Sequence, residues 1–285
     1  MAFHFTPQLA RFLCSARGAE WLRQVERLSL TPAGRLSDLQ TLRRHLSADE
    51  AAAVLEQGLL RRRAGEKFGR AAGMLFTRPA LEQATHRQVA RYRAKRFAGL
   101  ARVADLGCGI GGDSLRLARV AGPVWGVGRG PVRLLCARHN AAVYGLSRRV
   151  RFAQADMLAL PVPLPRFNAL FADPARRTTA GARVFSPRRY RPPLDALLAA
   201  FAHRPMGIKV APGLDYAPLA AVGEVEVISL RGEAKEAALW FNALATPGVT
   251  RRATLLPGEQ TLTGNAPGDC PVGPLSDFLF EPDPA

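Results

Sequence analysis

The sequence predicts an α/β protein in which a mainly parallel sheet follows a helical N-terminal part. From Ala101 onward, short apolar runs alternate with helix-like stretches, a pattern typical of parallel strands joined by crossover helices. Before Ala101 the apolar spacing is helical, and a glycine-rich turn over residues 107–112 joins the first predicted strand to a helix. The chain of 285 residues, 48% of them hydrophobic, is long enough to bury a large core.

Helix-start signals organise the first hundred residues. Ser47-Ala-Asp-Glu50 has capping-box spacing, in which the serine hydroxyl and the glutamate carboxylate bind amides that a helix start leaves unpaired. Ser37-Asp-Leu-Gln40 has the same form and predicts a second start. Pro79 suits the first turn of a helix that continues to Lys95. We therefore expect an all-α domain over residues 1–98.

The apolar runs after Ala101 predict a sheet domain over residues 99–245. Its last two runs, 224–230 and 236–241, are close enough to form a closing hairpin. After Ala245 the periodicity fades, so residues 246–285 are expected to be a tail or the start of a truncated module. The other expected strands are 102–106, 124–127, 149–153, 168–172 and 206–210, and the expected helices are 113–120, 132–144 and 194–203.

The chain carries 40 basic and 23 acidic residues, a net charge of +17. Two interpretations stay open: a polyanionic partner such as nucleic acid, or arginine enrichment by a GC-rich genome. The distribution favours a partner, because 12 basic residues and only two acids lie between Arg61 and Arg102, and a second basic cluster runs from Arg166 to Arg191. Such clusters can neutralise several phosphates.

Several kinds of site are not indicated. The four cysteines form no Cys-x-x-Cys pair, and the five histidines have no partners at the spacing of a metal site or a hydrolytic triad, so we expect no metal. No uncharged apolar run reaches the length of a membrane span, and residues 1–16 lack the pattern of an export signal. We therefore expect a cytoplasmic protein with no membrane contact, and we leave its oligomeric state open.

The glycine turn carries the most informative motif, Asp-Leu-Gly-Cys-Gly-Ile-Gly-Gly-Asp over residues 105–113. Glycine lets a nucleoside lie against bare backbone near a helix N-terminus. The string resembles the cofactor motif of class I S-adenosylmethionine-dependent methyltransferases, whose Rossmann-like sheet has seven strands. The resemblance implies S-adenosylmethionine as cofactor, with Asp105 or Asp113 near its amino-acid end. The implied cofactor-binding residues of this turn are Asp105, Gly107, Cys108, Gly109, Gly111, Gly112 and Asp113.

Two further strand ends bear on the cofactor. Asp156 and Met157 follow the third strand, where the family places a carboxylate that binds the adenine amine; the alternative for Asp156 is a helix cap. The second strand departs from the family, which ends it in an acid that binds the ribose hydroxyls. Here Gly128 and Gly130 occupy the acidic positions. The cofactor is then expected to bind weakly, to use another group, or not to bind.

The fourth strand ends in Phe171-Ala-Asp-Pro-Ala-Arg-Arg177, which is similar to the Asp/Asn-Pro-Pro-aromatic loop of amino-directed methyltransferases. That loop accepts hydrogen bonds from the target amine, which implies Asp173 and Pro174 as the catalytic residues. The loop also resembles that of uracil-C5 methyltransferases, which need a cysteine nucleophile, and Cys270 is a poor candidate. The aromatic position is not matched, so base stacking and substrate binding are expected from Arg176, Arg177, Phe185 and Tyr190.

A longer set of matches resembles a narrower group: bacterial methyltransferases with a THUMP-like C-terminal domain, related to trimethylguanosine synthase. They include residues 67–85, 183–194, 209–214 and 233–240. The resemblance implies methylation of RNA, either tRNA or rRNA, with a guanine exocyclic amine favoured as the target. Residues 278–285 resemble the segment that leads into the THUMP-like domain, which we expect this chain to lack.

We therefore predict an RNA methyltransferase. The main alternative is a non-catalytic RNA-binding protein that keeps the fold but has lost cofactor affinity, as Gly128 and Gly130 would permit. A nicotinamide-dependent oxidoreductase is disfavoured because its ribose-binding acid would be missing too, and because it would leave the Asp173 loop unexplained.

Overall fold

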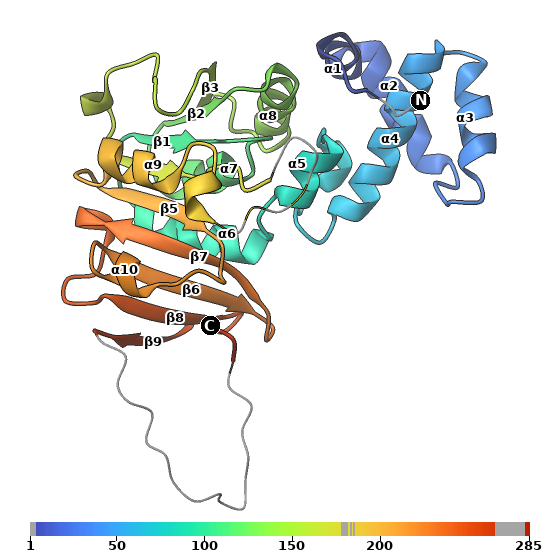
Figure 1. Cartoon of the computed structure of the whole chain (residues 1–285). Helices are drawn as coiled ribbons and strands as arrows, with labels where there is room; N and C mark the ends of the chain where they lie inside the picture. The colour runs from blue at the N-terminus through green and yellow to red at the C-terminus, as the bar shows by residue number, and fades with distance from the viewer. Residues whose placement is uncertain (1–3, 178–181, 183, 185, 266–282) are drawn as a thin grey trace, which may run out of the picture.

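The computed structural model describes residues 4–177, 182, 184, 186–265 and 283–285 (Figure 1). Within these residues the chain before Val103 contains helices and no strand. Three short 3-10 helices, η1 (Val25–Arg27), η2 (Ala71–Gly73) and η3 (Lys95–Phe97), punctuate this part. Its α-helices are α1 (Pro7–Cys14), α2 (Ala16–Gln24), α3 (Arg35–Arg43), α4 (Ala48–Ala64), α5 (Arg78–Gln83) and α6 (Arg87–Ala94).

The capping box predicted before α4 is present. The Ser47 hydroxyl accepts from the Glu50 amide, and the Glu50 carboxylate accepts from the Ser47 amide. The start predicted at Ser37 is wrong, because α3 already begins at Arg35. Ser37 lies inside that helix, and the Asp38 carboxylate instead binds the amides of the preceding loop.

The single helix expected from Pro79 to Lys95 is interrupted. Pro79 lies in the first turn of α5, as predicted, but α5 ends at Gln83 and Ala84 is extended. A new helix, α6, begins directly after its N-cap residue His86, whose Nδ1 accepts a hydrogen bond from the Gln88 amide. The break creates an α5–α6 loop, residues 84–86, in the middle of an otherwise helical pattern.

The first seven strands are β1 (Val103–Leu106), β2 (Val124–Gly128), β3 (Val150–Gln154), β4 (Ala169–Ala172), β5 (Met206–Val210), β6 (Glu224–Leu230) and β7 (Ala234–Phe241). With β8 (Arg251–Leu256) and β9 (Gln260–Gly264), they form a sheet in the order β3-β2-β1-β4-β5-β7-β6-β8-β9. Strands β1 (Val103–Leu106) to β5 are parallel, and β7 runs antiparallel to both β5 and β6, so the predicted hairpin is present. Every residue of β1, β4 and β5 is buried, as expected for strands with helices on both faces.

Within the described residues the sheet has nine strands rather than the seven expected. The additional strands β8 (Arg251–Leu256) and β9 (Gln260–Gly264) lie in the segment expected to be a tail. β8 pairs parallel to β6, and β9 pairs antiparallel to β8 at the sheet edge. The apolar pattern did not reveal β9 because all five of its residues are exposed, with Leu262 at 75%.

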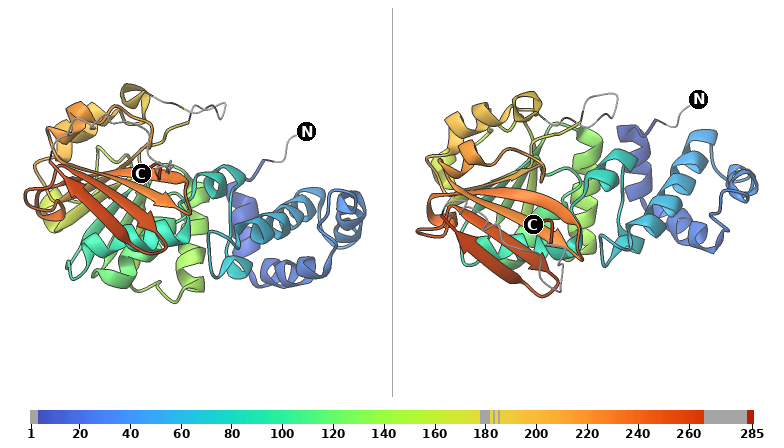
Figure 2. Two further views of the ribbon diagram at one scale, coloured as in Figure 1. Left: turned by 90° about the horizontal axis from the view of Figure 1, so that it is seen from below. Right: turned by 60° about the horizontal axis from the view of Figure 1, so that its bottom comes forward.

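Helices cover both faces of the sheet (Figure 2). On one face α7 (Gly112–Val120) and α8 (Pro131–Val143) pack on Val103 and Phe171, and α6 lies beside α7. On the other, α9 (Leu194–Phe201) and α10 (Ala217–Ala220) pack against the alternate strand residues. The described residues of this part also form the 3-10 helices η4 (Leu164–Arg166), η5 (Pro187–Arg189) and η6 (Asn242–Leu244).

The N-terminal helices do not enclose a core of their own. One continuous hydrophobic cluster extends from Leu13 through Phe76 to the sheet residue Val103, and α1 packs against α8. The buried side chain of Asn140 on α8 binds the amide and the carbonyl of Leu75 at 2.8 and 3.0 Å. A separate all-α domain is therefore not confirmed, and the boundaries at residues 98 and 245 stay predictions.

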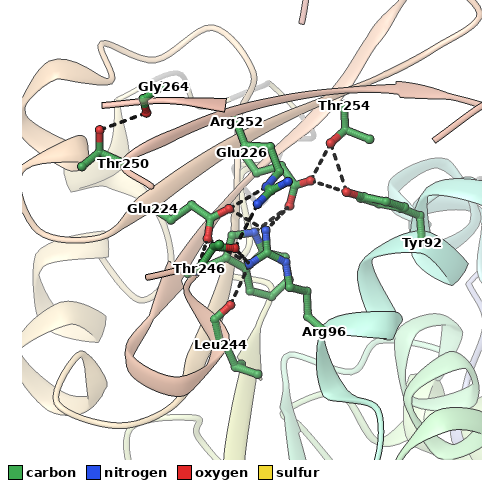
Figure 3. A network of polar contacts seen from close by, with 11 residues as sticks. Tyr92, Arg96, Glu224, Glu226, Leu244, Thr246, Thr250, Arg252, Thr254 and Gly264 are labelled. Atoms are coloured by element: carbon green, nitrogen blue, oxygen red, sulfur yellow. Dashed lines mark hydrogen bonds and ion pairs between the residues drawn. The ribbon is translucent and has the colours of Figure 1, made fainter. Parts of the chain in front are cut away.

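Helix α6 is tied to the antiparallel end of the sheet by a buried polar network (Figure 3). Tyr92 donates to Glu226 at 2.7 Å, and Arg96 pairs with Glu224. The side chains of Glu224 and Glu226 are fully buried, and Trp240 donates to Glu226 at 2.8 Å. Because these contacts fix α6, they also fix the α5–α6 loop at the edge of the candidate site.

Candidate active site

A cavity of about 780 Å³ lies at the carboxyl ends of the parallel strands. This edge is where ligands bind in open α/β sheets. Its lining residues come from the loops after β1, β2, β3, β4 and β5, from the α5–α6 loop and from the β6–β7 turn. Predicted site residues that line it are Gly107, Cys108, Gly109, Gly112, Asp113, Asp156, Met157, Asp173, Pro174, Arg176 and Arg177.

The glycine turn touches the loop that follows β4. Gly107 has a φ of +94°, and a Cβ at this position would lie 2.5 Å from the backbone oxygen of Asp173. Glycine is therefore required for both conformation and space. Gly109 differs, since a Cβ there would meet nothing within 4 Å and the residue lines the cavity. Gly111 caps α7 with a φ of +86° and does not line the cavity.

Of the two acids in the motif, Asp113 lines the cavity and Asp105 does not. Asp105 is fully buried behind the turn, where the Ser114 hydroxyl donates to its Oδ2, and its Oδ1 has no hydrogen-bond partner among the residues that the structure describes. Burial, followed by the nearby charge of Asp113, raises the pKa of Asp105 to about 8. The Asp105 side chain supports the turn from behind rather than lining the cavity, so its role at the cofactor stays a prediction.

Asp113 is held by the buried guanidinium of Arg93, which also pairs with Glu236 on β7. The guanidinium carbon lies 4.4 Å from the centre of the Phe171 ring. Burial lowers the pKa of Arg93, but Asp113 and Glu236 more than offset this and raise it overall. Helix α6 thus provides a permanent cation at the start of α7.

The end of β2 has no carboxylate. Gly128 and Gly130 line the cavity, and a Cβ on Gly128 would meet Cys108 Sγ and Leu134 at 3.4 Å, an ordinary contact. The Arg133 side chain packs 3.7 Å from the Cβ position of Gly130 and lines the cavity as well. Burial lowers the pKa of Arg133. The ribose position predicted from the sequence is therefore bordered by glycine and arginine.

Asp156 lies on the neighbouring loop after β3. Its Oδ1 accepts from the Leu158 amide at 2.9 Å, and its Oδ2 lies 3.7 Å from Arg129. The local bond forms a turn rather than a helix cap, since no helix begins there. Asp156 lines the cavity beside Met157, as a group that binds adenine would need to.

The β4 loop places Asp173 and Pro174 in the cavity wall next to the glycine turn. Ala175 forms a pair of backbone hydrogen bonds with Arg191, which brings the η5 segment against this loop. Tyr190 does not line the cavity: its ring is 1% exposed and its hydroxyl accepts from the Ala211 amide at 3.3 Å. The structure does not place Tyr190 where a base in the cavity could stack on it, so that role stays a prediction, and Phe185 lies outside the described residues.

The predictions omitted Lys209, although its ammonium binds Asp173. Lys209 is the penultimate residue of β5, and its Nζ lies 2.9 Å from Asp173 Oδ2 and 2.8 Å from Thr85 Oγ1. One signal could have found it: the chain has only four lysines among its 40 basic residues. Lys67 and Lys235 line the same cavity.

The two basic clusters differ in what their charges do. Most basic residues between Arg61 and Arg102 form hydrogen bonds or ion pairs with other residues of the chain. Residues with internal partners there are Arg61, Arg62, Lys67, Arg70, Arg78, Arg93, Lys95 and Arg96. In the second cluster, Arg188, Arg189 and Arg191 are exposed, and Arg176, Arg177 and Arg191 line the cavity. The arginine-rich rim of the cavity is therefore the better candidate for contacts with phosphates.

Comparisons with known proteins decide the family. Two Mycobacterium tuberculosis strains each have an uncharacterized S-adenosylmethionine-dependent methyltransferase that is 39% identical over 246 residues, covering 83% of this chain and 67% of theirs. The chain belongs to this family of S-adenosylmethionine-dependent methyltransferases. Its cofactor is S-adenosylmethionine. A model described as RNA cap guanine-N2 methyltransferase matches residues 100–186 of this methyltransferase, and a domain of unknown function matches residues 7–64.

The fold agrees with this assignment. A crystal structure described as a candidate methyltransferase from Porphyromonas gingivalis W83 superimposes with a TM-score of 0.63 at 21% identity, which shows the fold. It covers 82% of this chain and 65% of that chain, so this methyltransferase spans about two thirds of the length of the relatives it matches. Within the part of the chain that the structure describes, no helix is long and apolar enough to cross a membrane.

The cavity fits the cofactor except at one position. The glycine turn provides open backbone at Gly109, and Asp113 and Asp156 provide carboxylates for an amino group and an adenine amine. The residues at the end of β2 provide no carboxylate for ribose hydroxyls.

Proposed function

We propose that this methyltransferase transfers a methyl group to an exocyclic amine of an RNA base, with guanine favoured. The observation that carries the proposal is the contact between the glycine turn and the Asp173 loop inside one cavity. Methyl donor and acceptor would then be adjacent, and holding two reactants in line accounts for much of the rate of such a transfer. The family model described as RNA cap guanine-N2 methyltransferase supports a guanine amine.

In this proposal Gly107, Gly109 and Asp113 hold S-adenosylmethionine from the β1 side, and Asp156 binds its adenine from the β3 side. The cofactor supplies an electrophilic methyl group when bound. Asp173 accepts a hydrogen bond from the target amine and orients its lone pair, and the backbone carbonyl of Pro174 accepts a second. The amine loses one proton, which Asp173 or water takes up, so no strong base is required.

The RNA would lie across the arginine-rich rim. Arg176, Arg177 and Arg191 line the cavity, and Arg188 and Arg189 are exposed on η5 next to it. Phosphate contacts from these residues would make RNA binding fall with salt. The relation to trimethylguanosine synthase and to proteins with a THUMP-like domain is part of this proposal and fits an RNA substrate.

The test is a comparison of modified nucleosides in RNA from a deletion strain and its parent, followed by methyl transfer with the purified protein. Loss of one methylated nucleoside, restored by the wild type but not by Asp173→Ala, supports the proposal. Equal activity of Asp173→Ala and the wild type overturns the catalytic assignment.

A second function, RNA binding without catalysis, is favoured by one observation only: Gly128 and Gly130 replace the expected ribose acids. Calorimetry with S-adenosylmethionine distinguishes the two functions, because the non-catalytic protein would bind RNA but not the cofactor.

A further inference from the structure

Three of the four lysines in the chain line the cavity, although arginine is far more common in this sequence. Lys67, Lys209 and Lys235 are these three, whereas the fourth, Lys95, forms a half-exposed pair with Glu259 away from the cavity. An ammonium is a compact charge with three donors, and a guanidinium is a larger planar fork. Lysine rather than arginine at these three positions therefore indicates that each of them needs a compact cation.

We propose that Lys209 is the positioning residue for Asp173 in the methyl transfer, an inference that rests on the proposed function. Its ammonium holds Oδ2 of Asp173 at 2.9 Å and leaves Oδ1 for the target amine. The described residues give Oδ1 no hydrogen bond. With one oxygen fixed, the carboxylate is restricted to one orientation beside Gly107.

The ammonium has two anchors on separate elements. It donates to Asp173 on the β4 loop and, at 2.8 Å, to Thr85 Oγ1 on the α5–α6 loop. The Lys209 side chain is 4% exposed. Because a buried charge can move only as far as its partners allow, the position of Asp173 depends on Thr85.

The α5–α6 loop is held in turn by a second lysine. Lys67 Nζ donates to the carbonyls of Leu81 and Glu82 at 2.9 and 3.0 Å, just before that loop. Lys67 and Lys209 thus connect the N-terminal helices to the reacting side of the cavity. The helices before the sheet are therefore part of the site.

The positioning role can be separated from a structural one because Asp173 is partly open to solvent. Its side chain is 24% exposed, so removal of the lysine leaves a carboxylate that water can reach. Lys209→Met should then fold and keep the affinity for S-adenosylmethionine, while the reaction slows.

The test is methyl transfer from radiolabelled S-adenosylmethionine to RNA purified from cells that lack the gene, with cofactor affinity measured by calorimetry. We expect Lys209→Met to lower kcat on the order of 10²-fold, as misplacement of a catalytic group does. Lys209→Arg should not restore kcat, because the guanidinium is too large to bind both anchors. Lys95→Met is the matched control and should behave as wild type.

A double-mutant cycle decides whether Lys209 acts through Asp173. If it does, Asp173→Asn combined with Lys209→Met is no slower than Asp173→Asn alone. If the loss in kcat of the double variant is instead the product of the two single losses, or if Lys209→Met keeps the wild-type kcat, the role of Lys209 is overturned. The proposed function would still stand. Absence of transfer by the wild type would overturn both.

Discussion

Replacement of Arg93 by methionine should destabilise the protein strongly, because Arg93 is the cation between two carboxylates in the interior. The side chains of Arg93 and Glu236 are 3% and 1% exposed, and that of Asp113 is 16% exposed. Removing one partner of a buried pair leaves an uncompensated charge and costs about 3–5 kcal/mol. The loss can be measured by urea unfolding followed by circular dichroism.

The charge, rather than the lost volume, should account for most of this cost. Adding Glu236→Gln to Arg93→Met removes the stranded carboxylate, so the double variant should be more stable than Arg93→Met alone. Lys95→Met removes an exposed cation two residues away and should cost no more than about 1 kcal/mol. An Arg93→Met variant as stable as the wild type, or one that Glu236→Gln does not improve, would refute this reasoning.

Three further predictions concern the cofactor side of the cavity. The pKa of Asp105 is raised by burial to about 8 from 3.8, so the folded state binds the proton more tightly than the unfolded state and stability falls as pH rises from about 4 to 8. Asp105→Asn should remove this loss, so the free energy of unfolding of the variant, measured in urea, should exceed that of the wild type by an amount that grows from about pH 4 to 8. A difference that stays constant with pH would contradict the prediction. Gly128→Asp restores a carboxylate at the end of β2 and should tighten S-adenosylmethionine binding about 10-fold or more in calorimetry; unchanged affinity would mean that the ribose lies elsewhere. Gly107→Ala places a Cβ 2.5 Å from the Asp173 carbonyl and should abolish cofactor binding. Gly99 also has a positive φ, but a Cβ there has no contact within 4 Å, so Gly99→Ala should only lower stability. Equal cofactor binding by both variants would contradict the close contact between the glycine turn and the Asp173 loop.

The parallel core of the sheet was predictable because burial on both faces gives continuous apolar runs. The run at 206–210 coincides with β5, and the hairpin of β6 and β7 is present. β9 was not predictable, since an exposed edge strand such as Gln260–Gly264 carries no apolar pattern. The break between α5 and α6 was hidden for a different reason: it lies at a tertiary contact of Thr85 with Lys209, 124 residues away, which local spacing does not show.

Most of the motif residues line one cavity, because the carboxyl ends of parallel strands meet at one edge. The contacts of the individual residues could not be predicted from the sequence. Asp105 and Asp113 are equivalent acids in the string, yet only burial and the position of Arg93 distinguish them. The charge between Arg61 and Arg102 was misleading for the same reason, because composition does not show which guanidinium groups already have internal partners.

Titration of the purified protein with S-adenosylmethionine tests the central claim most directly. The wild type should bind one equivalent of the cofactor. Asp173→Ala should bind it with similar affinity, because Asp173 is proposed to contact the acceptor amine rather than the cofactor. Gly109→Val, whose added side chain enters open space in the cavity, should not bind, while Gly99→Val should. No heat from the wild type, or equal binding by Gly109→Val, would contradict the placement of the cofactor against the glycine turn.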